Sequence, residues 1–183
     1  NIELAQKSAQ AVLKIVPKLV KAENLLNRDR SQLKLVVSPK VSLSPELDDF
    51  LNNLRLREIN IILFPDWQQP EESLYLQLEG VITTLFAQKE PSKITALLDI
   101  SNISEEDANL VLSSVIMNIL MQEDLDETDI PEISLLGNLS KMQWKALLPC
   151  IHYRVVLENE NLQAVTQSGA GSLPCLKAAN LTI

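Results

Sequence analysis

Two kinds of apolar pattern alternate along the chain. Short, nearly unbroken apolar runs are followed by longer stretches in which apolar residues recur at spacings of three and four, and the alternation repeats roughly every 30 residues. Unbroken runs are typical of parallel strands covered on both faces, whereas the longer spacing is typical of helices that pack on one side. The predicted strands span residues 33–37, 59–64, 94–100, 133–136 and 153–157.

Helix-start signals support the helices expected between these strands. Ser104 and Ser140 each stand just before a helical stretch, where a hydroxyl can accept a hydrogen bond from a backbone N–H of the first turn. Parallel strands that alternate with helices are joined by right-handed crossovers. We therefore expect an α/β protein, with a Rossmann-like three-layer α/β/α fold, a mainly parallel five-stranded sheet and an N-terminal helix.

The sequence divides into three predicted segments. Residues 1–30 form an N-terminal helical segment in which lysines separate the apolar positions and Pro17 introduces a kink. Residues 31–167 form the Rossmann-like α/β domain, and residues 168–183 form a C-terminal tail behind a joint rich in serine and glycine. Because the sequence starts at Asn1 without an initiator methionine, we expect it to belong to a longer parent chain.

Composition narrows the class of protein. The 183 residues are 46% hydrophobic, which is enough for a sizeable core, and their formal charge of −8 argues against binding to nucleic acid. No apolar run approaches the roughly 20 residues of a membrane span, and no secretory signal opens the sequence. Cys150 and Cys175 are expected to be reduced thiols, and the alternative is a pairing between them. A cytoplasmic location is predicted.

A binding site in such a sheet is expected beyond the carboxyl ends of its strands. The residues that follow the predicted strands therefore form the candidate rim of a ligand cleft, and they are Asp66, Trp67, Asp99, Asn102, Asn138 and Glu158. Several of them have structural alternatives. Asp66 would cap the turn made by Pro65, Trp67 would pack beneath the next helix, and Asp99 would pair with backbone amides.

The usual cofactor signals are missing from the sequence. The turn at residues 38–42 lacks the glycines of a dinucleotide or methyl-donor site, and no phosphate loop occurs elsewhere. The acidic stretch at residues 123–129 lacks the glycine and distal glutamate of a calcium loop, and His152 is the only histidine. We therefore expect neither a cofactor nor a metal, and no residue is assigned a catalytic role.

Several stretches together resemble a module of large cyanobacterial proteins. In those proteins the module accompanies tetratricopeptide repeats, glycosyltransferase domains or FkbM-type methyltransferase domains. The resemblance covers roughly residues 58–165 and is carried by Ile62-Leu63-Phe64-Pro65-Asp66-Trp67, Asp99-Ile100-Ser101-Asn102-Ile103-Ser104-Glu105-Glu106-Asp107-Ala108-Asn109-Leu110, Glu132-Ile133-Ser134-Leu135-Leu136-Gly137-Asn138, and residues 144–148 and 156–161.

The order of elements in that module is similar to one Rossmann-like half of a GT-B glycosyltransferase. Such enzymes hold a sugar nucleotide between two halves, and this chain is long enough for one. The resemblance implies a glycosyltransferase-associated domain that recognises a sugar nucleotide or an acceptor and is not catalytic by itself. The alternative is a non-catalytic interaction module that docks a protein partner through its acidic surface and first helix.

Overall fold

The computed structural model describes residues 45–122, 130–178 and 181. Three predicted features lie outside the described residues: the N-terminal helix at 2–28, the strand at 33–37 and the acidic loop at 123–129. These three features therefore stay predictions.

The described residues form an α/β domain around a five-stranded, all-parallel sheet. Four of the strands lie where the sequence predicted them. Their apolar runs fill both faces of the sheet, and all but one of the residues of β1 and β2 are buried. The strand order is β3-β2-β1-β4-β5, with β1 paired from Ile59↔Ile94 to Leu63↔Leu98 along β2. The strands are β1 (Ile59–Leu63), β2 (Ile94–Asp99), β3 (Glu132–Leu136), β4 (Tyr153–Val156) and β5 (Cys175–Lys177).

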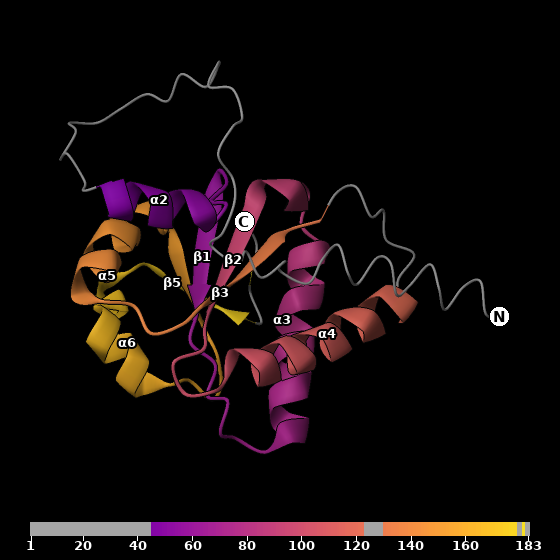
Figure 1. Cartoon of the computed structure of the whole chain (residues 1–183). Coiled ribbons are helices and arrows are strands. Elements are labelled where there is room, and N and C mark those ends of the chain that lie inside the picture. Colours follow the sequence, from indigo (N-terminus) through magenta and orange to yellow (C-terminus); the bar gives the residue numbers. More distant parts are fainter. Residues whose placement is uncertain (1–44, 123–129, 179–180, 182–183) are drawn as a thin grey trace.

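Helices cover both faces of the sheet, which makes the three predicted layers (Figure 1). Helices α3 and α4 pack on one face, where Leu78 and Ile116 contact a cluster that includes Ile61. Helices α2, α5 and α6 pack on the other face, around Ile62 and Trp144. The helices are α2 (Pro45–Asn53), α3 (Glu71–Phe86), α4 (Glu105–Gln122), α5 (Lys141–Leu147) and α6 (Leu162–Ser168), with short 3₁₀ turns at Pro91–Lys93, Leu148–Cys150 and Ala170–Ser172.

The predicted N-caps are confirmed. Ser140 Oγ accepts a hydrogen bond from the Gln143 backbone N–H (3.3 Å), and Gln143 Oε1 accepts one from the Ser140 N–H (2.8 Å), which completes a capping box. Ser104 Oγ accepts a hydrogen bond from the Asp107 N–H at 3.1 Å. Among the described helices, none is both long and apolar enough to cross a membrane.

The C-terminal region differs from the predicted tail. Gly169, at φ +80°, ends α6, and a 3₁₀ turn then leads into β5, which pairs with β4 from Arg154↔Cys175 to Val156↔Lys177. Serine and glycine here make a helix end and a turn rather than a joint. Because β5 is an edge strand of three residues, it is too short to give a periodic signal.

The strand order places a switch point between β1 and β4. The chain passes from β1 outward to β2 and β3, then returns to the other side of β1 for β4 and β5. The loops after β1 and β4 lie side by side, because the Asp66 N–H donates to Asn159 O (3.2 Å) and the Asn161 N–H donates to Phe64 O (2.9 Å). Ligands of open parallel sheets bind where the strand order reverses in this way.

Candidate functional site

A cavity of about 530 Å³ opens at this switch point, and we call it the polar cleft. It lies beyond the carboxyl ends of β1 and β2, with α6 as one wall. Its lining is dominated by carboxamide, hydroxyl and carboxylate side chains, namely Asp66, Gln68, Ser101, Asn102, Asn138, Glu160, Asn161, Gln163 and Gln167. The polar cleft can therefore both donate and accept hydrogen bonds around a ligand.

Asp66 and Asn102, two of the predicted rim residues, join two walls of the polar cleft. Asp66 Oδ1 accepts hydrogen bonds from Asn102 Nδ2 and from the Gln68 backbone N–H, both at 3.1 Å. The carboxylate thus caps its own turn and also contacts the neighbouring loop. Asn102 Oδ1 is buried and has no hydrogen-bond partner among the described residues.

Asp99 ends β2 as a buried carboxyl group, with the residue 1% exposed. Its Oδ1 accepts hydrogen bonds from the Ser101 hydroxyl (2.6 Å) and the Ser101 N–H (3.2 Å), as its structural alternative predicted. Burial raises the pKa of Asp99, and the two hydrogen bonds from Ser101 oppose that rise. Asp99 also lines a second cavity of about 530 Å³, which shares Ser101 and Asn138 with the polar cleft.

Asn138 and Trp67 have opposite surroundings. Asn138 follows β3, is exposed, and lines both the polar cleft and the second cavity. Trp67 is buried in the core on the α3 and α4 face, and its Nε1 donates to the Asp99 backbone oxygen at 2.7 Å. Trp67 therefore fastens the loop after β1 to the end of β2 and lines neither of these two cavities.

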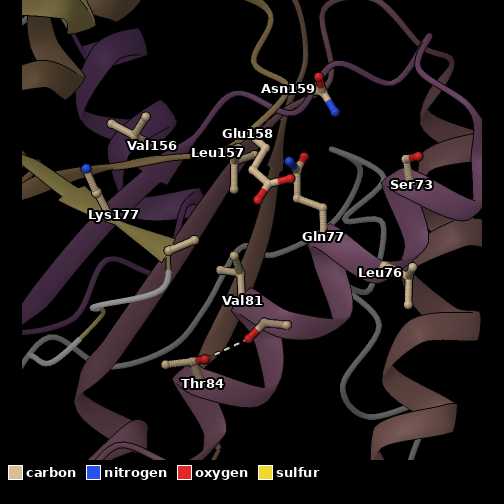
Figure 2. A pocket seen from close by; sticks show the side chains of 12 residues that line it. Ser73, Leu76, Gln77, Val81, Thr84, Val156, Leu157, Glu158, Asn159 and Lys177 are labelled. Atoms are coloured by element: carbon tan, nitrogen blue, oxygen red, sulfur yellow. Dashed lines mark hydrogen bonds between the residues drawn. The ribbon is translucent and has the colours of Figure 1, made fainter.

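Glu158 lies away from the other predicted rim residues. It lines a groove of about 740 Å³ between α3 and the ends of β4 and β5, and it is absent from the lining of the polar cleft. Figure 2 shows its side chain extending toward Gln77 of α3, with Leu157 and Val81 beside it and Lys177 across the groove. The structure thus brings together Asp66, Asn102 and Asn138 and places Glu158 in a different cavity.

Helix α6 supplies site residues that the sequence prediction missed. Gln163 and Gln167 stand four residues apart and therefore share one face of α6, where both are exposed in the polar cleft. Asn161 caps the helix by accepting the Ala164 N–H (3.1 Å), and its Nδ2 donates to Ser101 Oγ (3.3 Å). Two signals in the sequence could have identified these residues: an asparagine that can cap a helix just before Leu162, and two glutamines spaced to share one helix face.

Glu160 lines the polar cleft as one half of an ion pair. Arg154 Nη1 lies 2.9 Å from both Glu160 carboxylate oxygens, and the two side chains are 12% and 7% exposed. The guanidinium therefore compensates the charge of Glu160 inside the protein. The same guanidinium donates to the Cys175 thiol at 3.4 Å.

Other chemistry-bearing residues lie apart from the polar cleft. In the described part of the chain, no group of three His, Cys, Asp or Glu side chains is arranged to hold a metal ion. His152 is exposed at the amino end of β4, where its Nδ1 accepts the Asn60 N–H at 3.1 Å. Cys150 and Cys175 are free thiols.

Comparison of the chain with known protein families, curated proteins and solved structures finds no match in any of the three.

Proposed function

We propose that this chain is a glycosyltransferase-associated Rossmann-like domain that contributes saccharide recognition at the polar cleft. The observation that carries the proposal is the position of a cleft lined by polar side chains at the switch point of the sheet, between the loops after β1 and β4. The resemblance of residues 58–165 to the cyanobacterial module supports the same class of function.

The chemistry of the lining suits a ligand that carries many hydroxyl groups. Each hydroxyl both donates and accepts, and each carboxamide offers an oxygen acceptor and two N–H donors. Asn138 follows β3, whereas Gln163 and Gln167 lie on α6, so exposed carboxamides line the polar cleft from two parts of the fold. A pyranose ring placed there would meet hydrogen-bonding partners on more than one side.

The proposed role is recognition rather than catalysis. Glycosyl transfer needs a positioned base or nucleophile at the ligand. In the described lining of the polar cleft, Glu160 is held by Arg154 and Asp66 by Asn102. Asp99 is buried and bound by Ser101. A second domain of a parent protein would supply the reacting groups.

A backbone-amide NMR titration of the 183-residue chain tests this proposal. The probes are UDP-glucose, GDP-mannose and the disaccharides maltose, cellobiose and lactose. At least one is expected to give saturable shifts at residues 66–68, 101–102, 138 and 160–167, and Asn138→Ala should weaken its binding about tenfold. Glu158→Gln, a change in the separate groove, is the matched control. Shifts confined to other surfaces, or no shifts from any probe at 10 mM, would refute the proposal.

A second candidate function, the protein-interaction module, is favoured by one observation on α4. Leu110, Met117 and Met121 follow one outer face of this helix and are 71%, 37% and 73% exposed. Apolar residues also fill its inner face, so α4 carries apolar side chains on two sides, and only the inner side is covered by the rest of the described structure. Helices α3 and α4 together contain six acidic residues and no lysine or arginine. We propose that this face fits an amphipathic helix of another protein whose leucine stripe is bordered by lysines.

A designed lysine–leucine amphipathic peptide, labelled for fluorescence anisotropy, tests this second candidate. The peptide is expected to bind the 183-residue chain, and Met117→Glu should weaken binding at least tenfold. Because this substitution adds a negative charge, purely electrostatic binding would become tighter instead. Unchanged or tighter binding of the Met117→Glu variant would therefore refute docking on α4.

A further inference from the structure

We infer that the polar cleft takes the uncharged hydroxyl groups of an acceptor saccharide and discriminates against phosphate, so that it is not the site of a nucleotide diphosphate. This inference rests on the proposed function. It narrows the class of ligand, because the sequence left both a sugar nucleotide and an acceptor open and the polar cleft favours the acceptor. Three features of the cleft carry it: the backbone of the loop after β1, the capping of two helices, and the balance of charge.

The first two residues of the loop after β1 offer a phosphate no free backbone donor. In a dinucleotide fold, glycines at this turn let backbone N–H groups reach the pyrophosphate. Here the turn contains Pro65, which has no N–H, and Asp66, whose N–H already donates to Asn159 O. The Asp66 carboxylate also lines the polar cleft and would repel an anion.

Each of the two helices that begin near the cleft has one first-turn amide engaged by its own capping side chain. Ser140 Oγ accepts the Gln143 N–H at the start of α5, and Asn161 Oδ1 accepts the Ala164 N–H at the start of α6. A phosphate would have to displace these caps before it could use the same amides. Capping thus removes one N–H donor from each helix start.

The charge of the lining points the same way. Asp66 and Glu160 line the polar cleft, and Asp99 lines the second cavity beside it. Arg154 is committed to Glu160, and Lys141 is exposed at the rim of the second cavity only. A phosphate dianion would enter a site with more negative than positive charge, whereas a neutral hydroxyl meets no such electrostatic penalty.

The experiment compares matched ligands on the 183-residue chain by NMR titration at low ionic strength. Maltose is set against maltose 1-phosphate, and UDP-glucose is included as the nucleotide. We expect maltose, or cellobiose with its 1-phosphate if maltose gives no shifts, to bind at residues 66–68, 101–102 and 160–167. The phosphorylated partner should bind at least tenfold more weakly.

A variant that introduces a positive charge sharpens the test. Gln167→Lys places a cation in the polar cleft and should improve binding of the phosphorylated sugar at least fivefold relative to the neutral one. Thr166→Lys, an exposed α6 position outside the lining, adds the same charge and should leave the ratio unchanged. Equal or tighter binding of UDP-glucose or maltose 1-phosphate at the cleft would overturn this inference and leave saccharide recognition standing. Failure of every probe to bind would overturn both.

Discussion

The strands of the sheet begin at one side, which we call the amino edge, and end at the other, which we call the carboxyl edge. These two edges use polar side chains in opposite ways. At the amino edge, Asn60 is 4% exposed, and both ends of its carboxamide are paired: Oδ1 accepts the Arg57 N–H (2.9 Å), and Nδ2 donates to the backbone oxygens of Arg57 and Cys150 (both 3.1 Å). At the carboxyl edge, Asn102 uses its Nδ2 and leaves Oδ1 without a partner among the described residues, and Asn138 is exposed.

The difference separates polar groups that fasten the fold from those that a ligand can use. Arg57 also belongs to the amino edge, where it donates to Ile130 O (2.8 Å) and pairs with Glu132 (3.2 Å). These side chains tie strands and loops together and leave little hydrogen-bonding capacity unused. The carboxyl edge instead exposes Asn138 in the polar cleft, so the same residue type is paired inside the fold at one edge and exposed in a cavity at the other.

Asn60→Leu should have the largest effect on stability. The substitution removes the partners of three part-buried backbone groups, and each unpaired group costs on the order of 1–3 kcal/mol, so we expect a loss of about 3 kcal/mol. Urea unfolding followed by circular dichroism measures it. Asn138→Leu at the other edge should change stability by less than about 0.5 kcal/mol. Similar losses for both variants would remove the distinction between the edges.

Asn102→Ala should have a smaller effect on stability and a clear effect on binding. It removes one hydrogen bond to Asp66, which is worth about 1 kcal/mol, and we expect saccharide affinity at the polar cleft to fall about tenfold. Urea unfolding and NMR titration measure the two quantities. Asn109→Ala is the matched control, because Asn109 Oδ1 is also buried without a partner among the described residues but lies on α4, outside the cleft. A loss of affinity in the control would contradict a local role for Asn102.

Asp99→Asn should have the smallest effect, a gain in stability whose size depends on pH. Burial raises the pKa of Asp99 in the folded state, so the ionised carboxylate disfavours folding above the unfolded-state pKa, near 3.8. The amide oxygen of asparagine can still accept both hydrogen bonds from Ser101. The variant should therefore melt at a higher temperature at pH 7, with the gain vanishing as the pH falls below 3.8. Thermal melts from pH 3 to pH 8 check this, and a variant less stable at pH 7 would mean that the charge of Asp99 stabilises the fold.

Local chemistry was readable from the sequence because it depends on neighbours along the chain. The unbroken apolar runs predicted β1 to β4, and the hydroxyls of Ser104 and Ser140 predicted the helix starts that the structure confirms. The rule that ligands lie beyond strand ends selected Asp66, Asn102 and Asn138 together. Each of these predictions needs the strand or helix to which a residue belongs and no information about distant segments.

The tertiary structure alone decided which side of each loop a side chain occupies. Glu158 and Glu160 both follow β4, yet one lies in the groove beside α3 and the other in the polar cleft beside Arg154. Of the two alternatives that the sequence left open for Trp67, the structure has the one in which it packs in the core with α3, and its indole N–H donates to the Asp99 backbone oxygen at the end of β2. Gln167 reaches the cleft because β5 pairs with β4 and α6 crosses between them. Such placements depend on long-range packing, for which the spacing of residues along the chain carries no signal.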